Sequence, residues 1–172
     1  MKRLLLDVNV VLDYVLGRPP FSEPATELWS LAAAGRVAIV LPAHGVTTIH
    51  YLAARDRGRA FARRLMADLL VVPEIAAVDV SVLRRALGLE WPDFEDAVCA
   101  AAAEAAGCDF IVTRDPRGYR ESAVAAVDAP TALSLVRSSD PGEVRERAAR
   151  PDGGPSRKRR RSRPSATAGR RL

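Results

Sequence analysis

The stretch MKRLLLDVNVVLD, residues 1–13, joins a short apolar run to an abrupt acidic end. Leu4 to Leu6 form the run, Asp7 follows it directly, and a second short element begins near Asn9. Open α/β sheets place their chemistry on carboxylates of this kind, because the binding crevice lies just beyond the carboxyl ends of the strands. Taken alone, Asp7 is explained more simply as a cap of the following helix. The stretch predicts a buried strand and then a short helix, and acids elsewhere in the chain decide how Asp7 is interpreted.

The length of 172 residues and the composition indicate one globular domain with a sizeable core. Hydrophobic residues make up 48% of the chain and aromatic residues only 5%, which favours an α/β protein. No run of roughly eighteen apolar residues is present, and the three-Leu run is too short for a signal peptide, so we expect no membrane association. Cys99 and Cys108 form no CxxC pair, which favours reduced thiols and a cytoplasmic location.

The net charge of +5 averages two very different parts of the chain. Nine of the 26 Lys and Arg residues, but only one of the 21 Asp and Glu residues, lie in residues 150–172. The remaining 17 basic and 20 acidic residues give residues 1–149 a charge of about −3. The composition predicts a folded domain over 1–140 and a basic, disordered tail over 141–172. The tail segment RKRRRSR, residues 157–163, attracts polyanions, so RNA tethering and a simple solubility role are both open.

Apolar runs and helical periodicity alternate along the chain. The continuous apolar run Val37–Leu41 is bounded by Gly35 and Pro42, as in a buried parallel strand. Further short runs predict strands at 110–113 and 125–127, with 71–72 as an additional candidate. Helical patterns cover 22–34, 46–55, 58–70, 79–87, 93–107 and 130–136. This order predicts an α/β fold in which helices cover both faces of a parallel sheet.

Carboxylates occur where predicted strands end or a helix begins. Asp93 and Asp96 are three residues apart and share a helical face, whereas Glu95 is expected to point elsewhere. If the first strand lies beside the strand over 110–113 and parallel to it, Asp7 and Asp115 meet at one edge of the sheet. The helix start with Asp93 and Asp96 can face the same edge. The pattern therefore predicts one acidic site built from distant parts of the chain.

Such a cluster is costly at neutral pH, because neighbouring carboxylates repel one another and raise one another's pKa. A divalent cation removes this cost. Oxygen ligands without a convergent His or Cys favour Mg²⁺ or Mn²⁺ over Zn²⁺. A hard cation held by carboxylates suits phosphodiester hydrolysis, since it activates a water and neutralises charge on the phosphate.

Each acid also has a simpler explanation. Asp93 before Asp96 resembles a capping box, and acids in a first helical turn are favoured by the helix dipole in any case. Asp115 fits a turn in the segment Asp-Pro-Arg-Gly, residues 115–118. None of these acids is specific by itself, whereas all of them at element boundaries together indicate a site.

Two other groups of side chains leave their roles open. His44 and His50 are six residues apart and do not share a helical face, so loop or core histidines are favoured over a metal pair, with a general base as the alternative. A run of arginines offers contacts to RNA phosphates, although such runs are usually solvated helix faces. Its members are Arg55, Arg57, Arg59, Arg63 and Arg64.

Three blocks of the chain resemble the PIN-domain family, in particular the bacterial toxin ribonucleases of VapC type. LLLDVNVVLD resembles the opening D-x-N block, at Asp7 and Asn9. DFEDAVCAAAAEAAGCDFIVTRD resembles the central helix and following strand, with Asp96 at the metal-binding Asp and a T-x-D block at 113–115. The helix over 130–136 resembles the usual C-terminal P-x-x-x-L helix. The resemblance runs from residue 2 to about 137.

The resemblance implies a three-layer α/β/α PIN fold with a short parallel sheet and a Mg²⁺-dependent endoribonuclease centre, with Mn²⁺ as the alternative ion. The residues carried over are Asp7 and Asp96 as metal ligands, Asp93 and Asp115 as further catalytic acids, and Asn9 and Thr113 as supporting side chains that form hydrogen bonds. It also implies an RNA substrate, a cognate antitoxin and a homodimer.

One departure from the family concerns the helix after the second strand, HGVTTIHYLAAR. Many PIN enzymes carry a Glu early in this helix, where the present chain has Thr47 or Thr48. The loss leaves open whether one or two ions are bound, and Asp93 or Glu95 is a candidate to compensate. It also motivates the alternative of a catalytically weak PIN module that binds RNA or a protein. A haloacid-dehalogenase-like phosphohydrolase is a further alternative, but it needs a second Asp where this chain has Asn9.

Overall fold

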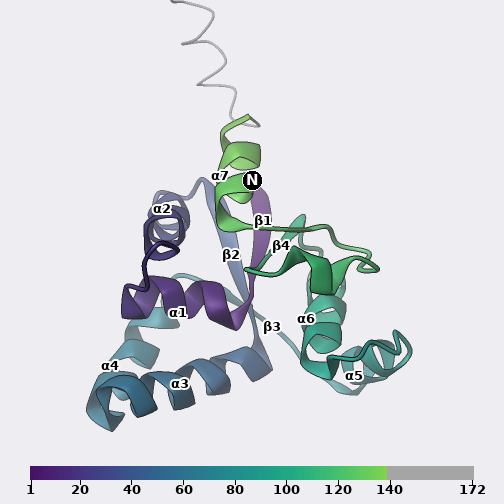
Figure 1. Ribbon diagram of the computed structural model, residues 1–172, viewed down its shortest axis with the longest axis horizontal. Coiled ribbons are helices and arrows are strands. Elements are labelled where there is room, and N and C mark those ends of the chain that lie inside the picture. The colour runs from purple at the N-terminus through teal and green to yellow at the C-terminus, as the bar shows by residue number, and fades with distance from the viewer. Residues whose placement is uncertain (139–172) are drawn as a thin grey trace, which may run out of the picture. The chain divides into compact units, whose positions relative to one another are not determined.

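Five parallel strands form the sheet at the centre of the protein. The computed structural model describes residues 1–138, and the strands run in the order β3-β2-β1-β4-β5 (Figure 1). The strands are β1 (Lys2–Leu6), β2 (Val37–Pro42), β3 (Glu74–Ala76), β4 (Phe110–Val112) and β5 (Ala126–Val127). The helices are α1 (Val8–Leu16), α2 (Ser22–Ala33), α3 (Ala43–Arg57), α4 (Arg59–Leu69), α5 (Val80–Leu87), α6 (Phe94–Ala105) and α7 (Ala129–Ser138), with a 3₁₀ turn η1 (Pro116–Tyr119).

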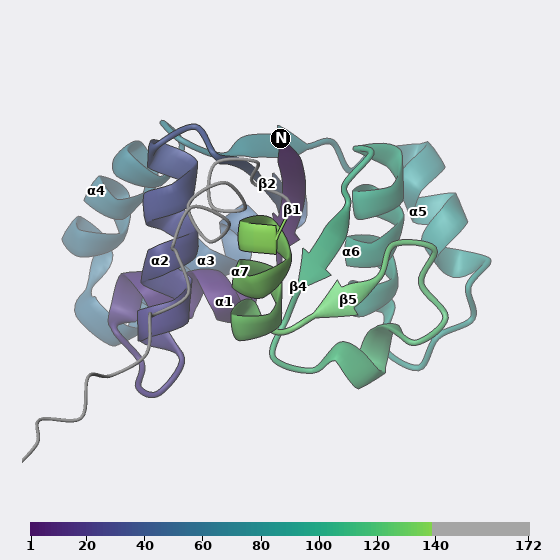
Figure 2. The same ribbon diagram turned by 90° about the horizontal axis from the view of Figure 1, so that it is seen from above.

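Alternate residues of the central strands face opposite layers of helices. Leu4 and Leu6 of β1 lie in one hydrophobic core with residues of α1, α2 and α7, whereas Leu5 lies in a second core with residues of α5 and α6. Because successive side chains of a strand point to opposite faces, each face of the sheet carries its own helical layer. Figure 2 shows α2 and α4 on one side of β1 and α5 and α6 on the other. The predicted α/β/α fold with a short parallel sheet is confirmed.

Helix α6 is built largely from small side chains. Its residues 97–103, AVCAAAA, are all at most 4% exposed. A helix that is apolar all round is buried on every side, here by the sheet and by α5. Alanine combines the highest helix propensity with the smallest apolar side chain, so α6 forms readily and lies close to its neighbours. The helix predicted over 93–107 is confirmed over 94–105.

The order of the strands reverses between β1 and β4. The chain runs from β1 outward to β2 and β3, and then returns to the other side of β1 to form β4 and β5. In open α/β sheets, ligands bind where the strand order reverses, beyond the carboxyl ends of the strands. Asp7 follows β1 directly and Thr113 follows β4 directly. The fold therefore places both ends of the predicted acidic site at the position where such sheets bind their ligands.

The additional strand candidate at 71–72 is wrong. Val71 and Val72 form part of the turn after α4 and are 79% and 43% exposed. The strand lies beyond Pro73 instead, where Glu74–Ala76 pair with Val40–Pro42 of β2. The two valines lie in the turn after α4, and the chain reaches the edge of the sheet only beyond them.

None of the helices in residues 1–138 has both the length and the hydropathy that crossing a bilayer requires. The predicted domain boundary at residue 140 and the predicted tail over 141–172 lie outside the described residues.

Asp13 of α1 and Arg114, which follows β4, form an ion pair. Nε of Arg114 donates to Oδ2 of Asp13 at 2.8 Å, and Nη2 donates to Oδ1. The Asp13 side chain is only 2% exposed, and the guanidinium of Arg114 lies 4.1 Å from the ring centroid of Phe21. A carboxylate buried this deeply is stable only with a counter-charge. The pair therefore fixes α1 against the loop that leads to Asp115.

We expect Arg114→Ala to lower the free energy of unfolding by about 3 kcal/mol, because it leaves the Asp13 carboxylate buried without a partner. Arg85→Ala is the matched control, since Arg85 pairs with Glu104 on the surface and exposed pairs contribute only about 0–1 kcal/mol. Urea denaturation of both variants measures the difference. An equal decrease in the free energy of unfolding in both variants would show that the buried Asp13 pair stabilises the protein no more than a surface pair.

Candidate active site

Asp7 is held at the end of β1 by a hydrogen bond from Thr113. Oγ1 of Thr113 donates to Oδ2 of Asp7 at 3.0 Å. Asp7 occupies the N-cap position of α1, but its side chain makes no capping hydrogen bond, so capping is not what its carboxylate does here. Burial raises the pKa of Asp7, the Thr113 hydrogen bond opposes the rise, and the negative charges of Glu95 and Asp96 add to it. The carboxylate of Asp7 therefore lies in a largely buried position near other acids.

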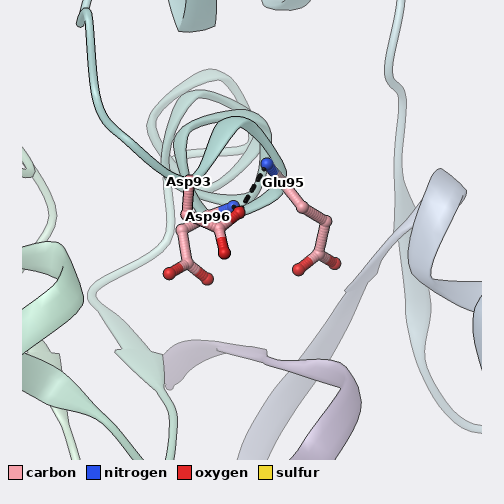
Figure 3. A group of neighbouring side chains, drawn as sticks. All are labelled: Asp93, Glu95 and Asp96. Atoms are coloured by element: carbon pink, nitrogen blue, oxygen red, sulfur yellow. Dashed lines mark hydrogen bonds between the residues drawn. The ribbon is translucent and has the colours of Figure 1, made fainter.

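The start of α6 gathers three further carboxylates, shown in Figure 3. Asp93, Glu95 and Asp96 each offer one oxygen within 4.8 Å of the others. Asp93 is also the cap of α6, because its Oδ1 accepts from the backbone N–H groups of Glu95 and Asp96 at 2.9 and 3.2 Å. The expectation that Glu95 points elsewhere is wrong. In Figure 3 the Glu95 side chain leaves the first turn of the helix apart from Asp93 and Asp96, but its carboxylate lies on the same side of the helix start as theirs.

Asp96 is held by a tyrosine and lies against a glycine. The hydroxyl of Tyr119 donates to Oδ1 of Asp96 at 2.8 Å. Burial raises the pKa of Asp96, the Tyr119 hydrogen bond opposes the rise, and the charges of Asp93, Glu95 and Asp115 add to it. A Cβ on Gly118 would lie 3.1 Å from Oδ2 of Asp96, so the missing side chain leaves room for this carboxylate.

Asp115 lies near Asp96, beside the same glycine. Its Oδ2 lies 4.0 Å from the position of a Cβ on Gly118. Its Oδ1 accepts from the backbone N–H of Arg117 at 3.1 Å, so Asp115 also stabilises the turn over residues 115–118, as the simpler explanation expected. The backbone N–H of Asp115 donates to Oγ1 of Thr113 at 3.2 Å. One hydroxyl therefore links the Asp7 carboxylate to the backbone that positions Asp115.

The structure thus brings together all four predicted acids and Thr113. Asn9 lies on α1 with an exposed side chain, and the described part of the chain gives its side chain no hydrogen bond. Its supporting role stays a prediction.

His44 lies beside the acids, whereas the sequence favoured a loop or core histidine. It lies in the first turn of α3, and its Nε2 donates to Oε1 of Glu95 at 3.2 Å. Its Nδ1 is buried and has no hydrogen-bond partner within residues 1–138. The hydroxyls of Thr47 and Thr48 donate to the His44 carbonyl at 2.7 and 3.5 Å. The position of His44 just after β2 was a usable signal, since it is the position that singled out Asp7 after β1.

Tyr119 is the second residue of the site that the sequence did not reveal. Its side chain is 3% exposed and packs edge-on against Trp91, with ring centroids 6.0 Å apart. Only its position four residues after Asp115 connected it with the site in sequence. Its hydroxyl reaches Asp96 because η1 turns the chain back over the start of α6.

The donor set fits a hard divalent cation. The group of acids that could share an ion supplies carboxylate oxygens only, and Asp7 and Asp96 both have raised pKa values that a bound cation would lower. Oxygen ligands of this kind suit Mg²⁺ or Mn²⁺. The arrangement can therefore hold a cation next to an anionic substrate.

A family model described as PIN domain matches residues 3–117. Among solved structures, VapBC2 from Rickettsia felis bound to a promoter DNA fragment matches with a TM-score of 0.59 and 13% identity, covering 73% of this chain and 98% of that one. VapC20 from Mycobacterium tuberculosis is described as a Sarcin-Ricin loop cleaving toxin. It matches with a TM-score of 0.57 and 16% identity, covering 69% of this chain and 94% of that one. FitAcB from Neisseria gonorrhoeae matches with a TM-score of 0.57 and 19% identity, covering 73% of this chain and 97% of that one. These likenesses show a shared fold. No curated protein matches the sequence.

The raised pKa of Asp7 makes its ionisation oppose folding at every pH above the ordinary value of an Asp carboxyl. We therefore expect Asp7→Asn to raise the free energy of unfolding of the metal-free protein at pH 7. The gain should disappear below about pH 4, where Asp7 is protonated in the folded and the unfolded protein alike. Thermal unfolding in a chelator from about pH 3.5 to pH 8 measures it.

Asp109→Asn is the control, and it should change the free energy of unfolding in the opposite direction. The hydrogen bond from Lys2 lowers the pKa of Asp109, so its ionisation favours folding and its loss should destabilise the protein at neutral pH. A destabilised Asp7→Asn variant at pH 7 would contradict the account of Asp7.

Proposed function

Because the chain belongs to the PIN domain family, we propose that it is a metal-dependent endoribonuclease that hydrolyses RNA phosphodiesters with Mg²⁺ or Mn²⁺. One observation carries the proposal: Asp7, Asp96 and Asp115 come from three separate parts of the chain and lie near one another beyond the carboxyl ends of β1 and β4. Carboxylates are not gathered in this way for stability, because their mutual repulsion costs free energy. Their convergence is best explained by a cation that they bind.

Asp7 and Asp96 would hold the ion, and Asp93 and Asp115 would complete the acidic pocket. A bound Mg²⁺ supplies charge neutralisation at the scissile phosphate and lowers the pKa of a water that it binds. The chain's own side chains keep the acids in place: Thr113 fixes Asp7 and Tyr119 fixes Asp96. Because Asp7 is 7% exposed, its carboxylate is shielded from bulk water and exerts a stronger field than a surface acid.

We also propose a cognate antitoxin as the partner, a homodimer as the assembly and the cytoplasm as the location. The FitAB structure bound to DNA and the Klebsiella pneumoniae structure, described as a toxin-antitoxin complex, support the antitoxin, because they share the fold over 73% of this chain. The neighbouring reading frame offers a direct check, since a short upstream gene for a DNA-binding protein is expected.

A catalytically weak PIN module that binds RNA or a protein without cutting it is the second candidate. Thr47 and Thr48 stand where many PIN enzymes carry an acid, and this favours the binding module. Within residues 1–138 the two hydroxyls bond to the His44 carbonyl of their own helix. Glu95, held by His44, supplies a carboxylate close to that position and favours the nuclease instead. The haloacid-dehalogenase alternative is set aside by the family match.

We expect the protein to cleave single-stranded RNA in Mg²⁺ or Mn²⁺ and to lose this activity in a chelator. Asp7→Asn and Asp96→Asn should each lower the cleavage rate by at least about 100-fold, because each removes a charge aimed at the cation. Asp109→Asn is the matched control, since Asp109 pairs with Lys2 at the opposite end of β1 and should leave the rate unchanged.

The cleavage assay separates the two candidates. RNA binding without metal-dependent cleavage by the parent protein would favour the binding module. Cleavage that persists in Asp7→Asn would point to a contaminating nuclease.

Tyr119→Phe should weaken Mg²⁺ or Mn²⁺ binding by about tenfold, because the side chains that orient metal ligands contribute about that much affinity. Tyr14→Phe is the control, since the Tyr14 ring stacks on Trp29 with centroids 4.9 Å apart and belongs to another part of the core. Isothermal titration calorimetry with Mn²⁺ measures both variants. Equal affinity of Tyr119→Phe and the parent would mean that the Tyr119 hydroxyl does not position Asp96.

A further inference from the structure

The structure separates the five arginines that the sequence presented as one run. Arg57 is used within the fold, because its Nη2 donates to the Leu16 carbonyl at 2.9 Å and its guanidinium lies 5.3 Å from the ring centroid of Phe61. Arg64 borders a separate, mainly apolar groove together with Asp68. The other three arginines, Arg55, Arg59 and Arg63, line one concave surface between α3 and α4.

This surface, which we call the basic groove, has a volume of about 430 Å³. Its lining residues are His50, Tyr51, Ala54, Arg55, Arg59 and Arg63. No acidic side chain lines it, and within residues 1–138 no ion pair joins any of its three arginines to a carboxylate. The Tyr51 side chain is 61% exposed. An uncompensated positive groove with an exposed aromatic ring, on a body that is acidic overall, suits an anionic ligand.

A stripe along α3 connects the basic groove with the acidic site. His44, Thr48, Tyr51 and Arg55 follow one another at intervals of four, three and four residues, which places them on one face of the helix. Eleven residues of helix span about 16 Å. The first member of the stripe contacts Glu95 of the acidic site, and the last lines the basic groove. A chain-like ligand lying along this face would reach both.

We propose that the basic groove binds the phosphate backbone of single-stranded RNA, with one base stacked on Tyr51, and that the strand continues along α3 to the acidic site. The proposal rests on the proposed nuclease function and assigns it a substrate-binding surface. Guanidinium groups match phosphate geometry through paired hydrogen bonds. Exposed aromatic rings beside basic side chains are how proteins hold single strands with little sequence preference. An acidic peptide would use the arginines but would leave the face of Tyr51 without a stacking partner.

The test is the salt dependence of RNA binding by the full chain in a chelator, where no cleavage is expected. The probe is a fluorescein-labelled oligouridylate, followed by fluorescence anisotropy. The slope of log affinity against log salt changes by about 0.7 for each phosphate contact that a single strand loses. Arg55→Gln, Arg59→Gln and Arg63→Gln should each flatten the slope by about 0.7, and the triple variant by about 2.

Arg84→Gln on α5 is the matched control, because Arg84 is an exposed helical arginine outside the groove and should leave the slope unchanged. The basic tail is present in every variant, so its contribution to binding is the same throughout. Tyr51→Ala should weaken binding at least about fivefold without changing the slope, whereas Tyr51→Phe should bind like the parent.

An unchanged slope in the triple variant would overturn the proposal. Polyglutamate that binds with the same dependence on the three arginines, while RNA shows none, would make an acidic protein segment the occupant. A shift of oligomeric state in the triple variant, measured by sedimentation, would make the groove an interface between copies. If the slopes change as expected but the parent cleaves no RNA in Mg²⁺, the nuclease proposal fails and the binding surface stands. If the parent cleaves RNA but the slopes stay unchanged, the nuclease proposal stands and the binding surface is rejected.

Discussion

The parallel pairing of β1 with β4 is the interaction on which the rest of the structure depends. Leu4–Leu6 lie opposite Phe110–Val112, and the backbone N–H of Asp7 donates to the Val112 carbonyl at 2.9 Å. This register sets Asp7 beside Thr113, although 106 positions separate them in the chain. A shift by one residue would turn Thr113 to the other face of the sheet and break the hydrogen bond to Asp7. The leucines of β1 make such a shift costly, because each of them is buried in one of the two cores.

The acidic site is held together against its own repulsion by hydrogen-bond donors. Thr113 donates to Asp7, Tyr119 donates to Asp96, and His44 donates to Glu95. Thr113 follows β4, Tyr119 ends η1, and His44 lies in the first turn of α3. Burial still raises the pKa of Asp7 and Asp96 despite these hydrogen bonds. A buried group of acids with raised pKa values is the kind of local cost that folds accept at candidate functional sites.

Helix α3 joins two surfaces of opposite charge. Its first turn carries His44 and contributes to the acidic site, and its second half carries Tyr51 and Arg55 of the basic groove, which α4 completes with Arg59 and Arg63. An anionic strand is attracted by one end and repelled by the other unless a cation lies between the acids and the phosphate. The distribution of charge along one helix therefore favours a substrate that is held at a distance from the acids and brought to them only with a metal.

The sequence by itself predicted the helices, the strands other than β3, a parallel sheet with helices on both faces, and the four acids as candidate site residues, because apolar runs, helical periodicity and element ends are local properties of the chain. It could not determine the strand at 74–76, since that strand depends on pairing with β2 and its own residues are largely exposed. Three contacts could not be predicted from it: the nearness of a Glu95 oxygen to those of Asp93 and Asp96, the hydrogen bond from Tyr119 to Asp96, and the hydrogen bond from His44 to Glu95. These contacts are set by the register and packing of distant elements. Local patterns decide which residues face a core or end a strand. Which of those ends meet, and with which partners, is decided only when the sheet is assembled.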